Sequence, residues 1–282
     1  MNPALVASRA GLSRGWIEFR QTLTTPGDLS GILITTGGFL AAIIWTRHTH
    51  VPGTHFSLGT TMLVSVLGLN VVIYGVIAMA DLLVIEREDG TLLRAKAIPN
   101  GMLGYLFGKV VNVSGQVVFV VATTLLIGAL LLTGLAIGSP GHWLTLAWVL
   151  GLGLLATLPL GAMLGSLFSS QRSAGGPMLL MLAGLSVISG IFYPITHLPT
   201  ILQWTGQAFP MYWLGLGMRS ALLPNAMAAV EIGHSWRHLA TFGVLSAWAV
   251  AGLVLAPVVL RRMARRESGS RVAARREKAM RA

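Results

Sequence analysis

Six long stretches of this chain contain no Lys, Arg, Asp or Glu. Each is long enough, at about 1.5 Å rise per residue, to cross the roughly 30 Å hydrocarbon core of a membrane as a helix. Only helices or closed barrels satisfy their backbone groups within lipid, and these stretches are too long and too uniformly apolar for barrel strands. We therefore predict an all-α polytopic membrane protein with six transmembrane helices, at residues 29–46, 56–80, 110–138, 143–168, 175–194 and 239–260.

The charges lie outside these stretches. Only 10% of the residues are charged, yet the net charge is +11, and the basic residues fall between and after the predicted spans. Positive charge in such places orients a membrane protein, so we expect no nucleic-acid partner. Because cysteine is absent, disulfides and thiolate metal sites are excluded. We expect no secretory signal peptide, since an Arg-bearing polar segment precedes the first apolar stretch.

The distribution of Lys and Arg predicts the topology. With six spans both termini lie on one side, and seventeen of the twenty basic residues fall on that side. The other side receives only Arg47, Arg219 and Arg237. The positive-inside rule therefore predicts cytoplasmic termini. The basic tail, residues 261–282, is expected to bind anionic lipid headgroups.

The connections between the spans are unequal in length. Residues 139–142 are all that separate the third span from the fourth, so we expect these two helices to form a tight antiparallel pair. Two connections are long, the cytoplasmic loop at 81–109 and the external segment at 195–238. Loops of this length usually carry a function.

The N-terminal segment, residues 1–27, carries apolar residues at helical spacing. Leu12, Trp16 and Phe19 recur on one face together with Leu5 and Leu23. A Trp-bearing helix flanked by arginines is typical of the membrane interface, so we predict an interfacial amphipathic helix. The alternative is a loosely ordered tail.

The cytoplasmic loop combines charges of both signs with apolar neighbours. Its central residues are Glu86, Arg87, Glu88, Asp89, Gly90, Thr91 and Leu92, and Pro99 follows. Gly90 permits a break and Pro99 a change of direction. Charged residues around apolar anchors suit a docking surface for another protein. A solvated connector is the alternative.

The order of these residues resembles a known family. The pattern Glu-Arg-Glu-x-Gly-Thr-Leu, followed by a Pro and then by Gly108-Lys109, is similar to the segment after the second span of type-2 ABC transporter permeases. The string Ser189-Gly190-Ile191-Phe192-Tyr193-Pro194, with Leu198-Pro199, Leu202, Pro210 and Arg219, looks like the end of the fifth span in that family and the segment after it. Leu93 departs from the pattern, because the family often has Glu there.

This resemblance implies specific partners. Residues 86–92 would form a coupling helix that contacts a separate ABC ATPase subunit, present in two copies, with the N-terminal helix as a second contact. A second permease chain, identical or paralogous, would complete a substrate path between the first, second and fifth spans. The resemblance also implies a multi-pass protein of the bacterial plasma (inner) membrane.

ATP hydrolysis is expected on the partner chain. A P-loop needs Gly-x-x-x-x-Gly-Lys followed by Ser or Thr. The nearest string here runs from Gly104 to Val110, is one residue short and ends in Val. We therefore expect this chain to be no enzyme and to hold no cofactor, with ATP and Mg on the ATPase subunit.

The external segment is rich in Pro, Trp, Tyr and Phe. Amphipathic aromatics settle at the membrane boundary, and we predict a short re-entrant helical segment that caps the exit. The candidate gate residues are Phe192, Tyr193, Pro194, Pro199 and Pro210. A plain interfacial loop is the alternative.

A few polar residues lie within the spans or in the first external loop. Asn70, Tyr74, Ser186 and Ser189 either bond neighbouring helices or face the substrate path. His48, His50 and His55 share one external loop, where imidazoles could bind zinc. The intervening Pro52-Gly53 favours an irregular solvated loop, so we predict no metal site.

These observations favour an exporter. We predict the permease subunit of an ATP-driven ABC exporter that moves an amphipathic or hydrophobic compound, such as a drug, an antibiotic or a lipid. The sequence looks nearest to the drug-export branch related to daunorubicin-resistance permeases. Export of a polysaccharide or glycolipid is the alternative. A secondary transporter would need ionisable groups within the spans, and a membrane-embedded enzyme would need a recognisable catalytic motif.

Overall fold

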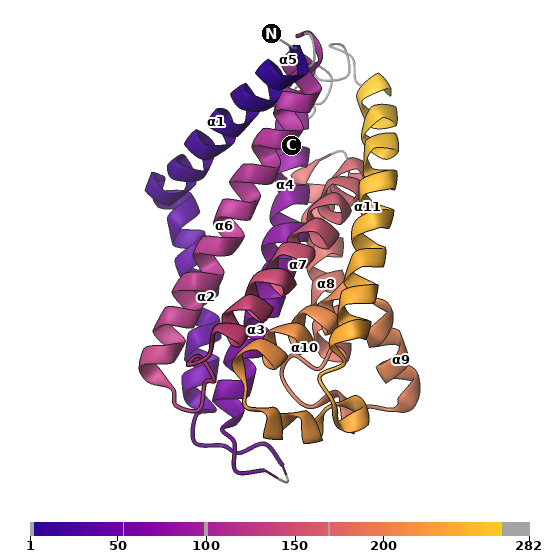
Figure 1. Cartoon of the computed structure of the whole chain (residues 1–282). Coiled ribbons are helices and arrows are strands. Elements are labelled where there is room, and N and C mark those ends of the chain that lie inside the picture. Colours follow the sequence, from indigo (N-terminus) through magenta and orange to yellow (C-terminus); the bar gives the residue numbers. More distant parts are fainter. Residues whose placement is uncertain (1–2, 53, 99–100, 169, 267–282) are drawn as a thin grey trace.

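The computed structural model describes residues 3–52, 54–98, 101–168 and 170–266. Its long helices lie roughly along one common axis, with the chain running in alternating directions (Figure 1). The beginning of α1 (Pro3–Thr24), the short helix α5 (Thr91–Lys96) and the last described turn of α11 (His238–Arg266) lie at one end of the bundle. Helices α9 (Thr200–Ala208) and α10 (Pro210–Leu222) lie at the other end. We call these the α5 end and the α10 end.

Within the described residues, five helices are long and apolar enough to cross a membrane. They are Pro26–Trp45 (α2), Leu58–Glu88, Gly104–Leu131, Pro140–Leu167 (α7) and His238–Met263. The second comprises α3 (Leu58–Val72), the π-helix η1 (Ile73–Ala78) and α4 (Met79–Glu88) without a break. The third belongs to α6 (Gly101–Leu131), and the last belongs to α11. The prediction of a helical, multi-pass membrane protein is confirmed.

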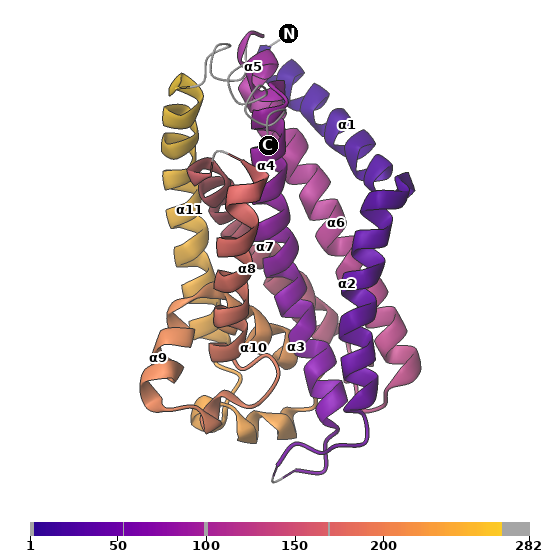
Figure 2. The ribbon, with the colours of Figure 1, turned by 180° about the vertical axis from the view of Figure 1, so that it is seen from behind.

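The predicted fifth span differs from the helix that forms there. Helix α8 (Gln171–Ile188) starts earlier than residue 175 and stops well before residue 194. Gly190 adopts a φ of +63°, a left-handed conformation that glycine tolerates best, and it turns the chain back toward Ile195. Helix α8 lies beside α4 (Figure 2) but is not among the five long apolar helices. Six spans therefore stay a prediction.

The third and fourth predicted spans do not form a tight antiparallel pair. Helix α6 ends at Leu131, and residues 132–137 form a non-helical connection in which Gly134 has a φ of +90°. The backbone N–H of Ala136 donates to the carbonyl of Leu222 at 2.8 Å, which holds this connection against α10. Helix α6 packs mainly on α1 and α3, whereas α7 packs on α11, α10 and α4. The predicted span at 110–138 therefore includes this connection, because the connection carries no charge either.

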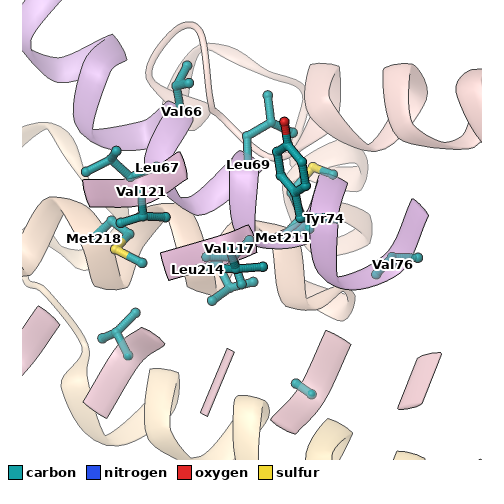
Figure 3. Packing of buried hydrophobic residues seen from close by; sticks show 14 of the residues in the cluster. Val66, Leu67, Leu69, Tyr74, Val76, Val117, Val121, Met211, Leu214 and Met218 are labelled. Carbon is teal, nitrogen blue, oxygen red and sulfur yellow. The ribbon is translucent and has the colours of Figure 1, made fainter. Parts of the chain in front are cut away.

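The second span forms the centre of the molecule. Side chains of α3, α6 and α10 meet in the buried cluster shown in Figure 3, where Leu67, Val121 and Leu214 are labelled. All of these are completely buried or nearly so. Gly68 of α3 lies directly against the backbone of Leu214 and Gly215, so α3 and α10 are in backbone contact. Close contact of this kind is typical of helix packing in membranes, where small residues form the interfaces.

The external segment contains several short helices. They are the 3-10 turn η2 (Ile195–His197), α9, α10, and the 3-10 turns η3 (Asn225–Val230) and η4 (Ile232–His234). Every residue of α10 is buried, and the helix packs on α3, α7 and α11. The external segment is therefore largely helical, as predicted. Whether α10 re-enters the outer leaflet stays a prediction.

Candidate functional site

The candidate coupling residues form a helical elbow at the α5 end. Helix α4 ends at Glu88, Gly90 takes a left-handed conformation with a φ of 75°, and α5 then starts at Thr91. Residues 86–92 are therefore two helix ends and a break, not the single coupling helix that was expected. Gly90 makes the break because a residue with a side chain disfavours that conformation. Pro99 lies outside the described residues.

Arg87 attaches this elbow to the neighbouring helix. Its Nη1 donates to the carbonyl oxygens of Phe168 at 2.8 Å and Ser166 at 3.2 Å. These carbonyls belong to the end of α7, where the last carbonyl groups of a helix lack partners within the helix. Arg87 satisfies them and fixes the end of α4 on α7.

The elbow divides into a buried part and an exposed part. Leu92 is 2% exposed, and α5 packs on α4, α6 and α11. Leu92 thus anchors α5 within its own chain and is not available to a partner. Asp89, Arg94 and Ile98 are exposed, and Glu88 is half-buried. These residues form the surface that a docking protein would meet.

Next to the elbow, one lysine joins three helices. Lys109 of α6 has a side chain only 4% exposed, and its Nζ lies 2.5 Å from Glu86 Oε1 of α4 and 2.6 Å from Glu18 Oε2 of α1. Glu18 also accepts from Arg14 Nε at 2.8 Å. These four residues, Arg14, Glu18, Glu86 and Lys109, are called the Lys109 cluster. Its two positive and two negative charges compensate one another.

The cluster holds Glu18 in its ionised form. Partial burial by itself would raise the pKa of Glu18, but the hydrogen bonds from Lys109 and Arg14 outweigh this and lower it below its usual range. The hydrogen bond to Glu18 in turn raises the pKa of Arg14. Both groups therefore keep their charges at neutral pH. Sequence reasoning missed Glu18, although its spacing from Arg14 is that of a helical ion pair.

Glycines bring α1 into backbone contact with α6. A side chain on Gly11 would collide with the carbonyl of Gly104, and one on Gly15 with the carbonyl of Gly108. Phe19, 9% exposed, continues this face, and its ring lies against Gly115. Leu12 and Trp16 point away and are 49% and 55% exposed. The Trp16 and Phe19 rings nevertheless lie 5.5 Å apart, so these two residues share a face, and the glycines beside that face contact α6. The interfacial position of this helix stays a prediction.

Comparison with known proteins assigns the family. A family model described as ABC-2 family transporter protein matches residues 53–251, more than two thirds of the chain. The chain belongs to the ABC-2 transporter family. No curated protein matches it. Membership supports the predicted type-2 ABC permease and implies an ABC ATPase partner. The matched region includes α4, α5 and two of the four residues of the Lys109 cluster, Glu86 and Lys109, but α1 precedes it.

At the α10 end, this ABC-2 protein contains a buried ion pair. Arg219 and Glu231 are 3% and 5% exposed, and two hydrogen bonds of 2.6 and 3.2 Å join the guanidinium to both carboxylate oxygens. Arg219 also donates to Ser65 Oγ of α3 at 3.0 Å. Because the guanidinium donates to both carboxylate oxygens, the contact fixes the relative orientation of the two side chains as well as pairing their charges. Sequence reasoning treated Arg219 as an external loop charge and missed Glu231.

The candidate gate residues surround this pair only in part. Phe192, Tyr193 and Pro194 line a small cavity together with Arg219 and Glu231. Pro199 precedes α9, and Pro210 is the buried first residue of α10. The five residues are thus divided between the turn after α8 and the starts of two helices.

The four polar candidates for the substrate path occupy different surroundings. Asn70 is 1% exposed and its amide has no hydrogen-bond partner in the part of the chain that the structure describes. Ser186 donates to the carbonyl of Leu182 at 2.7 Å, and Ser189 is completely buried. Tyr74 lines a sizeable cavity, a groove of about 430 Å³ between α2 and the η1–α4 segment. This cavity is called the α2 groove.

The first external loop carries the three histidines. Arg47 Nε donates to His48 Nε2 at 2.9 Å, and His50 pairs with Ser57 through the backbone. In the described ranges, no group of three or more His, Cys, Asp or Glu side chains is arranged to hold a metal ion. The loop therefore offers no support for the zinc alternative.

Proposed function

We propose that this chain is the permease subunit of an ATP-driven ABC exporter that moves an amphipathic or hydrophobic compound out across the bacterial plasma membrane. Two ATPase subunits and a second permease chain would complete the transporter. Family membership supports the general assignment. The α5 end supports the more specific assignment. There an exposed helical elbow, which could contact an ATPase, is held by buried contacts to several spans.

The elbow is built to transmit force. Arg87 ties the end of α4 to α7, and Lys109 ties it to α1 and α6. The second span continues without a break from Glu88 to Leu58, a length of about 45 Å at 1.5 Å per residue. A partner that pushes on α5 would therefore move one long helix together with its neighbours. Such a displacement shifts the balance between two conformations of the transporter.

The α2 groove supports an amphipathic cargo over a saccharide. Its lining is largely apolar, with Ile32, Ile77 and Ile85 among its residues, and Tyr74 is its single aromatic side chain. Stacking platforms for sugar rings would require more aromatic residues. We therefore favour the drug-export branch of the family over export of a polysaccharide or glycolipid.

The test is ATP hydrolysis by the assembled transporter. The chain is purified in nanodiscs with an ABC ATPase from the same genome, as wild type and as Glu88→Lys. We expect stable copurification and turnover for the wild type. The charge reversal should reduce turnover about tenfold or more, because it reverses the charge of a residue at the docking surface. Glu277→Lys makes the same charge change in the C-terminal tail and is expected to retain turnover.

Two results would contradict the proposal. If no ABC ATPase copurifies with the wild-type chain, the exporter assignment is wrong. If Glu88→Lys and Glu277→Lys behave alike, the elbow is not the docking surface, and the coupling contact must lie elsewhere on the α5 end.

A further inference from the structure

The α2 groove lies at the corner where α1 meets α2. It is bounded by α2 on one side and by η1 and α4 on the other, and its volume of about 430 Å³ is that of a small-molecule site. Thr22 near the end of α1 and Gly27 in the first turn of α2 form part of its wall. A molecule in the groove would therefore contact the first and second spans together.

Two carboxylates lie in this otherwise apolar groove. Asp28 comes from the first turn of α2 and Asp81 from α4, so the two acids approach the cavity from opposite walls. No basic residue is among the residues that line it. Within the described part of the chain, neither Asp28 nor Asp81 takes part in an ion pair. This differs from Glu18, Glu86 and Glu231, each of which is paired.

Tyr74 provides an independent indication of a ligand. Its side chain is more than nine-tenths buried, it lines the groove, and its hydroxyl has no hydrogen-bond partner among the described residues. Unlike the hydroxyls of Tyr105 and Tyr212, the Tyr74 hydroxyl is not fully buried, so a molecule in the groove can reach it. Tyr74 also belongs to the π-helix η1, a rare geometry that often occurs at functional sites. The groove thus contains an unused hydroxyl and an aromatic ring beside Asp81.

These features have complementary chemistry. Uncompensated carboxylates attract a cation, and the attraction is stronger next to low-dielectric walls than in water. An aromatic ring adds a further preference for a positive charge on its face. The isoleucines of the groove favour an apolar body. A neutral or anionic compound would leave both carboxylates without a partner.

We propose that the α2 groove binds a lipophilic cation, an amine or quaternary ammonium group on an apolar body, and that compounds of this class are the cargo. The assignment as cargo rests on the proposed exporter function. The binding of the cation does not, because it depends only on the groove. Asp28 and Asp81 take the charge, and the apolar walls take the body.

Binding is measured on the full-length permease alone, in zwitterionic nanodiscs without ATPase or ATP. The probes are tetraphenylphosphonium and tetraphenylborate, which are alike in size and opposite in charge, and equilibrium dialysis against empty nanodiscs corrects for partition into lipid. We expect the double variant Asp28→Asn/Asp81→Asn to weaken binding of the cation about tenfold or more. Binding of the anion should be unchanged or stronger.

Two controls accompany the double variant. Glu277→Gln removes one negative charge from the tail and should leave binding of the cation unchanged. The thermal midpoint of each variant reports folding, and the oligomeric state in nanodiscs reports whether two chains still associate. Both aspartates line the groove without a partner in the described chain, so we expect the asparagine variants to fold.

Three results would overturn the proposal. The first is equal binding of the cation by the wild type and the double variant. The second is a parallel loss of both probes, which would indicate a damaged groove and not a cation site. The third is loss of binding together with a change in oligomeric state, which would assign the groove to a contact between two chains. Each is distinct from failure of the ATPase experiment, which tests the exporter assignment.

Discussion

At the scale of single residues, Lys109 has the clearest predicted effect. It is buried between Glu86 and Glu18, at 2.5 and 2.6 Å. Lys109→Met would leave two carboxylates close together without their shared cation. Breaking a buried charge cluster in this way costs about 3–5 kcal/mol. We expect a clear fall in the thermal unfolding midpoint of the purified permease, measured by intrinsic fluorescence.

The matched variants separate charge from packing. Arg172→Met removes an exposed positive charge from α8 and should leave the midpoint within about 1 °C. The triple variant Lys109→Met/Glu18→Gln/Glu86→Gln removes the charges together and should recover most of the loss. If Lys109→Met is as stable as the wild type, the cluster does not hold the three helices together.

This cluster also marks a limit of sequence reasoning. The pattern around Gly108-Lys109 indicated the family, and Lys109 was counted among the cytoplasmic charges. Its partner Glu18 is 91 residues away in the sequence. Nothing in the local spacing of either residue reports that α1 and α6 come together. The same holds for Arg219 and Glu231, whose pairing depends on how the turns after α10 fold back.

At the scale of whole elements, α1 is held by glycines. Gly11→Leu would place a side chain against the carbonyl of Gly104 and force α1 away from α6. Overpacking of this kind costs about 1–3 kcal/mol, so amide hydrogen exchange in α1 should accelerate about tenfold or more. Ser13→Leu adds the same side chain to an exposed position of the same helix and should leave exchange unchanged. Equal exchange in both variants would contradict the backbone contact.

The elements show why composition predicts helices better than their ends. Absence of charge identified the second and fourth spans, which form the long helices Leu58–Glu88 and Pro140–Leu167. The same criterion placed the end of the third span too late, because the connection after Leu131 is as free of charge as the helix. A glycine with positive φ follows each of these helices, Gly134 after α6 and Gly190 after α8. In α1 the contact with α6 is made by glycines, which the spacing of large apolar residues does not identify.

At the scale of the whole molecule, the Leu58–Glu88 helix joins the two ends of the bundle. Phe192 lines the small cavity beside Arg219 at the α10 end, far from the elbow. Because the chain contains no cysteine, a single Phe192→Cys reports on that cavity without interference. If the elbow moves the long helix, trapping the assembled transporter with ATP and vanadate should change the rate of thiol labelling about threefold or more.

The same experiment distinguishes a transmitted movement from a local one. Thr200→Cys, on the exposed first turn of α9, should label at the same rate with and without ATP and vanadate, because α9 packs mainly on α8 and α10. Adding Lys109→Met to Phe192→Cys should weaken the response, since the ion pairs that join α4 and α1 to Lys109 of α6 are then lost. If the labelling rate of Phe192→Cys is the same with and without ATP and vanadate, the two ends of the bundle move independently.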